Sequence, residues 1–200
     1  MLTANLLQIH HDRVRCGSEA MYRAVEEDAA RACAVHGCPH PHLAIESVAA
    51  PMDVWWLNAF DSDADRQRVS DAYVANLPLM QALADVRRRR EGLLDVDVDV
   101  FVAYRRDLSR GDRPDVLGAR FITVAIVTGN DLPEGSVFET ADGTRYVFAP
   151  AATHDLAAAA ARRGNDPLVF AVRPYWGMPA REWIAADPEF WSANPAASLK

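Results

Sequence analysis

Hydrophobic residues in the first half of the chain recur with two different periods. A two-residue alternation runs through 5–14, 42–48, 54–60 and 94–104, which predicts four strands. Apolar residues recur at helical spacing from Ser18 to about His36 and again from Asp63 to about Gly92, which predicts two helices with an interruption at Pro78. The order strand, helix, two strands, helix, strand predicts an antiparallel sheet with strand order 4-1-3-2 and both helices on one face.

The second half repeats this pattern in shortened form. Residues 108–119 are polar and contain glycine and proline, so we interpret them as a linker between a unit at 1–107 and a second α+β unit at 120–175. This second unit has a strand at about 120–128, a hairpin turn at Asp142–Gly143, an alanine-rich helix from Thr153 to Gly164 and a last strand at 168–173. It lacks the first helix, and the ends 101–105 and 170–175 look alike. Residues 176–200 form a tail that holds three tryptophans, with a short helix around 179–186.

Alternation along each predicted strand divides the side chains of the sheet into two sets. The apolar set, which includes Leu7, Ile45 and Leu57, is expected to face the helices. The other set is polar and aromatic and is expected on the opposite face: Gln8, His10, His42, Ala44, Glu46, Val54, Trp56, Asn58, Phe60, Asp97, Asp99 and Phe101. Because this set is too aromatic to expose and too polar to bury without partners, we expect it to line a partly enclosed cavity against a second sheet.

The element order in residues 4–107, the strand VWWLNAF and the segment DVFVAYR resemble the dimeric α/β-barrel superfamily. In that group, ferredoxin-like βαββαβ units join by their open sheet faces to form a barrel. The group includes cofactor-free monooxygenases related to antibiotic biosynthesis, NIPSNAP-like proteins and haem-binding relatives of chlorite dismutase. The resemblance implies a ferredoxin-like α+β fold with a barrel-like arrangement, closed either within the chain or between two chains of a homodimer. The superfamily has no strict motif, so the resemblance assigns no catalytic residue.

The polar set suggests a site for small-molecule chemistry. We predict His10 as a general base, because its pKa lies near neutrality and a carboxylate would orient its ring. Asn58 is the second predicted catalytic residue, as a hydrogen-bond donor to a developing oxyanion. The predicted substrate-binding residues are Gln8, His42, Glu46, Trp56, Phe60, Asp97, Asp99 and Phe101. This hypothesis requires His10 to lie on the sheet face away from the helices.

Metal binding is the alternative chemistry. Two histidines and a carboxylate of the polar set could ligate a transition metal. The run from His36 to His42 holds three of the six histidines and Cys38, so it could bind structural zinc, but no second ligand pair is evident. No nucleotide, dinucleotide or serine-hydrolase motif is present, so the sequence predicts neither an organic cofactor nor a dedicated metal site.

Composition narrows the class of partner. The net charge of −7 argues against nucleic-acid binding, and the arginine run at 87–90 fits the solvated end of a helix. No apolar run reaches the roughly 20 residues needed to cross a bilayer. Three cysteines without a CxxC pair favour a reducing, cytoplasmic location. Three hypotheses remain: an enzyme acting on an aromatic or enolisable compound, a non-catalytic ligand-binding or oligomer-assembly protein, and a metal or haem protein.

Overall fold

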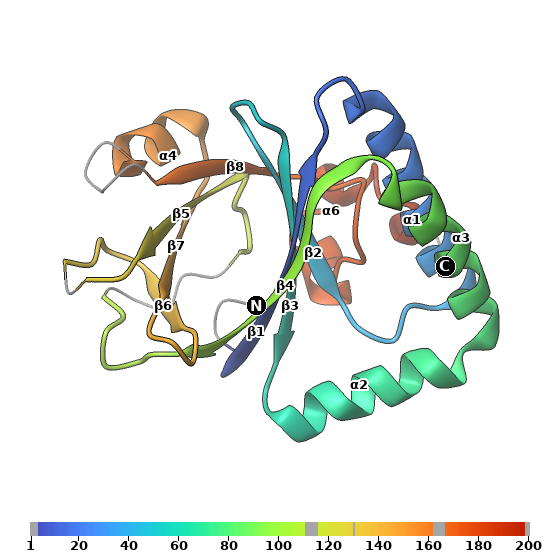
Figure 1. The fold of residues 1–200 in the computed structure, drawn as a ribbon, viewed down its shortest axis with the longest axis horizontal. Helices are drawn as coiled ribbons and strands as arrows, with labels where there is room; N and C mark the ends of the chain where they lie inside the picture. The colour runs from blue at the N-terminus through green and yellow to red at the C-terminus, as the bar shows by residue number, and fades with distance from the viewer. Residues whose placement is uncertain (1–3, 111–115, 130, 162–166, 199–200) are drawn as a thin grey trace.

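The computed structural model describes residues 4–110, 116–129, 131–161 and 167–198. Parts of several predicted segments fall outside these ranges: 1–3 of the first unit, 111–115 of the linker, 130 and 162–166 of the second unit, which include the end of its alanine-rich helix, and 199–200 of the tail. Within the described residues, a single antiparallel barrel of eight strands forms the centre of the molecule, with the long helices on one side of it (Figure 1).

The first half has the predicted element order. Its elements are β1 (Leu6–Val14), α1 (Glu19–His36), β2 (His42–Ser47), β3 (Asp53–Phe60), α2 (Asp63–Ala75), α3 (Leu77–Glu91) and β4 (Leu94–Tyr104). The Ser62 side chain caps α2, and Asn76 caps α3 one residue before Leu77 and Pro78, so the proline separates two helices as expected. The strands lie in the predicted order β4-β1-β3-β2.

The second half is a shorter unit of the same topology. Its elements are β5 (Phe121–Val127), β6 (Ser136–Glu139), β7 (Arg145–Ala151), α4 (His154–Ala161) and β8 (Leu168–Val172). The tail adds α5 (Arg181–Ala186), α6 (Pro188–Trp191) and a 3₁₀ helix, η1 (Pro195–Ser198). The strand order β8-β5-β7-β6 repeats that of the first half, and no helix joins β5 to β6 in the described residues. The α+β fold with a shortened second half is therefore confirmed.

The barrel closes within one chain, because β2 pairs with β8 and β4 pairs with β6. The two junctions are equivalent: Glu46 lies opposite Ala171, and Glu139 lies opposite Ala103. Each glutamate also pairs with an arginine two residues beyond that alanine. Glu46 Oε2 lies 2.6 Å from Arg173 Nε, and Glu139 binds Arg105. In the structure, Phe170 of the second half is therefore equivalent to Val102 of the first half. The similarity of 101–105 to 170–175 in the sequence instead aligns Phe170 with Phe101, which is one residue out of register.

The interior of the barrel holds the apolar side chains of both halves. Leu7, Ile9, Leu43 and Leu57 meet residues of β5 to β8 in one buried cluster, which also contains Trp183 and Trp191 of the tail. The prediction that this apolar set faces the helices is therefore wrong. Alternation shows which residues share a face, but it does not show which layer covers that face. Since a closed barrel excludes water, its interior takes the more apolar set.

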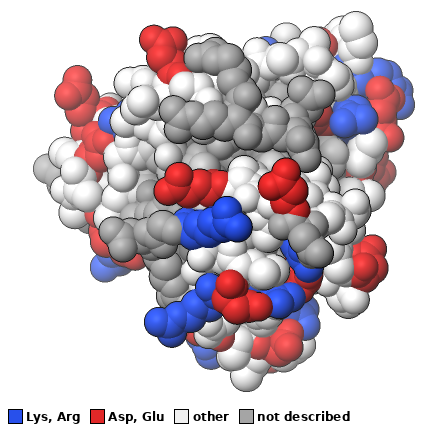
Figure 2. All heavy atoms as spheres, turned by 90° about the vertical axis from the view of Figure 1, so that its left-hand side faces the viewer, with Lys and Arg blue, Asp and Glu red and all other residues white. Residues whose placement is uncertain are grey.

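Charged side chains are distributed over the outer surface of the second half. On the face shown in Figure 2, acidic and basic side chains lie beside one another over the described residues. A helix long and apolar enough to span a bilayer is not found in the described part of the chain.

Candidate functional site

The polar set forms one block on the sheet, as the alternation predicts. Along β1, Gln8, His10 and Asp12 point to the same side, and β3 places Asn58 and Trp56 opposite the first two. Strand β4 places Phe101, Asp99 and Asp97 opposite Gln8, His10 and Asp12, respectively. Neighbouring residues in an antiparallel pair share a face, so residues distant in sequence become close neighbours.

This block faces the helices, because two cavities that it lines are also lined by residues of α1, α2 and α3. One has a volume of about 300 Å³ and is bounded by His10, Trp56 and Asp99 of the sheet and by helix residues including Ala30 and Arg90. The other, of about 470 Å³, extends toward Phe60 and Phe101 and under α2 and α3. Both are lined by Gln8, Asn58, Tyr73, Leu83 and Arg87. We call the joint space the sheet–helix cleft.

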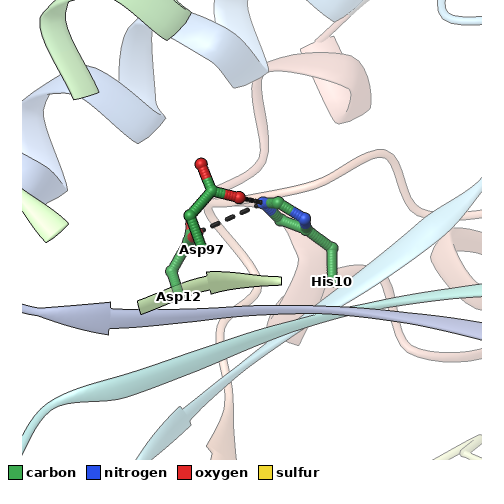
Figure 3. A group of neighbouring side chains, drawn as sticks. All are labelled: His10, Asp12 and Asp97. Carbon is green, nitrogen blue, oxygen red and sulfur yellow. Dashed lines mark ion pairs between the residues drawn. The ribbon is translucent and has the colours of Figure 1, made fainter. Parts of the chain in front are cut away.

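The expected location of the site, in a cavity between two sheets, is therefore wrong. His10 lies on the helix side, so the location that the catalytic hypothesis required for it is wrong, while the roles of His10 and Asn58 stay predictions. The side chains of His10, Asp12 and Asp97 rise from the strands toward the helices (Figure 3).

His10 lies among three carboxylates. Its Nδ1 is 3.2 Å from Asp99 Oδ1, which also accepts a hydrogen bond of 2.9 Å from the Gln8 side chain. Its Nε2 is 3.2 Å from Asp12 Oδ1 and 3.6 Å from Asp97 Oδ1. The ligating atoms of His10, Asp12 and Asp97 lie within 4.8 Å of one another, a spacing at which the three residues could hold a metal ion.

The second oxygen of Asp12 is held from the helices. Tyr22 donates a hydrogen bond of 2.7 Å to Asp12 Oδ2, and Arg90 Nη1 lies 3.5 Å from the same atom. Arg90 Nη1 also donates to Glu26 Oε1 at 3.4 Å. Asp12, Tyr22 and Glu26 are buried, so α1 and α3 fix the orientation of the Asp12 carboxylate.

These contacts shift the pKa values of the cluster. Burial would lower the pKa of His10, but the contact with Asp12 and its charge outweigh that effect and raise it. Burial would raise the pKa of Asp12, but His10 and Arg90 lower it overall. Burial raises the pKa of Glu26 to about 7, although Arg90 opposes the shift.

Most of the predicted site residues meet at the cleft. Gln8, His10, His42, Trp56, Asn58, Phe60, Asp99 and Phe101 line one or both of its cavities. Asp97 contacts His10 and is 47% exposed. Glu46 lies apart: Arg23 and Arg173 each bind it at 2.6 Å, so its carboxylate is part of the barrel junction.

The His36–His42 run does not form a metal site. Among the described residues, three ligating atoms come together at His10, Asp12 and Asp97, and not in this run. His40 stacks on Phe60, and the Cys38 sulfur lies 2.7 Å from the Tyr73 hydroxyl oxygen. The zinc interpretation is therefore not supported.

Sequence reasoning missed several residues of the site. Asp12 continues the alternation of Gln8 and His10 by one step, so extending that pattern would have found it. Tyr22, Glu26 and Arg90 lie on helices whose faces are set by packing against the sheet. A helical period does not specify which sheet residues a given helix position meets.

Comparisons with known proteins add information on the fold. No protein-family model matches the sequence, and no curated protein matches it. Among solved structures, a proposed monooxygenase from Fusobacterium nucleatum superposes with a TM-score of 0.52 at 8% identity, over 88% of this chain and 93% of that chain. A proposed chlorite dismutase gives 0.48 at 10% identity, over 84% and 94%. A NIPSNAP-family protein from Agrobacterium tumefaciens gives 0.37 at 16% identity, over 50% and 87%.

The chain therefore shares the fold of the Fusobacterium nucleatum structure, and its own strands close an antiparallel barrel. The resemblance seen in the sequence is thus confirmed at the level of fold. Identities this low carry no statement about the reaction, the ligand or the assembly.

Proposed function

We propose that this α/β-barrel protein binds a flat, largely apolar small molecule with an acidic group in the sheet–helix cleft. The observation that carries the proposal is the lining shared by the two cavities. Tyr73 and Leu83 supply apolar surface, Gln8 and Asn58 supply amide groups, and Arg87 supplies a cation. A concave, mostly apolar space with a few polar groups is the usual form of a small-molecule site.

Arg87 accounts for the acidic group. Its neighbours in the arginine run have acidic partners: Arg88 and Arg89 bind Asp85, and Arg90 binds Glu26. Within the described part of the chain, no carboxylate lies within ion-pair distance of Arg87, which borders both cavities. A carboxylate or phenolate of the ligand would satisfy this guanidinium.

Binding of 2-naphthoate, a flat aromatic carboxylate, tests the proposal by calorimetry in the presence of a chelator. We expect saturable binding that Arg87→Gln weakens by about tenfold, because a hydrogen-bonded charge is lost. Arg88→Gln is the matched control, since this exposed neighbour has Asp85 as its partner. Absence of saturable binding, or equal weakening by both variants, would contradict the proposal.

A proton-transfer reaction on the ligand is the second candidate function. It is favoured by the carboxylate-bound imidazole of His10, which lines the same cavity as Asn58 and Gln8. His10 would exchange a proton with the ligand, and Asn58 would donate a hydrogen bond to the oxygen that gains charge. Proton transfer of this kind is isomerase-like chemistry on an aromatic or enolisable compound and needs no organic cofactor. A monooxygenase-like reaction would begin with the same proton transfer and would need O₂ as a second substrate.

Exchange of the acidic protons of 2-tetralone for deuterium, followed by NMR with chelator present, tests this candidate. We expect the protein to accelerate exchange, and both His10→Ala and Asn58→Ala to remove at least about 90% of the acceleration. A rate equal to that in buffer would exclude the reaction for this class of compound while leaving the binding proposal intact.

A further inference from the structure

His10, Asp12 and Asp97 each bring one ligating atom to the same small region, where the three atoms lie within 4.8 Å of one another (Figure 3). His10 Nε2 and Asp12 Oδ1 are buried and make no hydrogen bond with any described residue, although they are 3.2 Å apart. That separation suits a hydrogen bond, but the direction of the atoms does not. The pair therefore meets the distance of an ion pair but not the geometry of a hydrogen bond. Buried polar atoms without a hydrogen-bond partner call for a further partner.

We propose that the cluster is a binding site for a divalent first-row transition cation. Two ligand atoms that are each about 2.1 Å from a shared ion, at angles of about 90° to 110°, lie about 3.0 to 3.5 Å apart. The separations from His10 Nε2 are 3.2 Å to Asp12 Oδ1 and 3.6 Å to Asp97 Oδ1. The first separation lies in this range and the second just above it, and all three ligand atoms lie within 4.8 Å of one another. Movement of the half-exposed Asp97 side chain would bring the three atoms to the ion.

The remaining atoms of the ligands are already oriented by neighbours. Asp99 binds His10 Nδ1 at 3.2 Å, which turns Nε2 toward the proposed ion. Tyr22 donates to Asp12 Oδ2 at 2.7 Å and leaves Oδ1 available. Partners that hold the second nitrogen of a histidine and the second oxygen of a carboxylate are characteristic of metal sites.

Charge and accessibility agree with this assignment. Two carboxylates and a neutral imidazole balance a divalent cation, and Glu26 partly compensates the charge of Arg90. One imidazole with two carboxylates suits Mn²⁺, Fe²⁺, Co²⁺ or Zn²⁺. Asp97 is 47% exposed, so the ion has an open side for water or for a ligand in the cleft.

The inference does not rest on the proposed ligand. With the cation bound, His10 would coordinate it and could not transfer protons, so the two proposals make separate predictions. Binding of 2-naphthoate and proton exchange are measured with chelator present, whereas the cation is titrated alone.

Titration of the metal-free protein with Co²⁺, followed by calorimetry and visible absorption, tests the proposal. We expect saturable binding with an absorption band, and a loss of affinity of at least about tenfold in Asp97→Asn. This variant should fold, because the side chain is half-exposed. Asp95→Asn is the matched control: it lies two residues away on β4, is 52% exposed and pairs with Arg15. We expect it to keep the affinity within about twofold.

Two results would overturn the proposal. The first is the absence of saturable Co²⁺ binding by the wild-type protein. The second is an equal change in Asp97→Asn and Asp95→Asn, which would show that the cation associates with the acidic surface of β4 and not with the cluster.

Discussion

At the residue scale, the buried carboxyl group of Glu26 on α1 makes the free energy of unfolding depend on pH. It is 2% exposed, and burial raises its pKa from 4.5 to about 7. A carboxyl group with a raised folded-state pKa stabilises the fold fully only below its unfolded pKa. That stability is lost as the pH rises through the folded pKa. Glu26 should therefore reduce the free energy of unfolding by about 2 to 3 kcal/mol between about pH 5 and about pH 8.

The variant Glu26→Gln lacks this titration. We expect its stability relative to the wild type, measured by urea denaturation, to increase from about pH 5 to about pH 8 by that amount. Glu27→Gln is the control, because Glu27 is 51% exposed on the same helix. A difference between Glu26→Gln and the wild type that does not change with pH would show that Glu26 remains ionised throughout.

At the element scale, the β6–β7 region depends on a glycine that admits no side chain. Gly135 has a φ of 151°, and a Cβ there would lie 2.6 Å from the carbonyl oxygen of Phe148 in β7. Gly143, in the turn between β6 and β7, has a φ of 88° but nothing within 4 Å of its Cβ position. We expect Gly143→Ala to cost about 1 to 2 kcal/mol of stability from backbone strain alone.

Gly135→Ala should cost on the order of 3 kcal/mol or more, because the backbone of β7 must also move. Thermal and urea denaturation of the two variants measure the difference. Equal losses would show that β7 shifts without cost. The turn itself was predictable from Asp142–Gly143, whereas the constraint at Gly135 depends on the pairing of Ser136 with Phe148.

The elements were predictable because their signals are local. Alternation marks β1 to β4, and Ser62 and Pro78 mark the boundaries of α2 and α3. The site was predictable only in part. Gln8, His10 and Asn58 were grouped correctly because a two-residue period defines a sheet face. The layer over that face was not predictable, because both faces of this sheet are covered and neither is plainly solvated.

At the scale of the whole molecule, the two halves close one barrel through equivalent junctions. Strand β2 pairs with β8, and β4 pairs with β6. Strand β6 has the same position in the second half as β2 in the first, and β8 the same position as β4. A fragment of residues 1–107 would expose both edge strands and the apolar interior face that includes Leu7 and Leu43. Exposed edges and apolar faces associate, and a two-fold arrangement satisfies both.

We therefore expect this fragment to form a homodimer in which β2 of each copy pairs with β4 of the other. Glu46 would then meet Arg105 of the second copy, in place of the Arg173 that it binds at 2.6 Å in the full chain. Sizing chromatography with light scattering measures the mass, and Arg105→Glu should weaken the dimer because it places two carboxylates together. Arg106→Glu is the control, because Arg106 is the adjacent residue and is exposed. A folded monomeric fragment, or equal weakening by both variants, would show that the second half closes the barrel by contacts that the first half does not share.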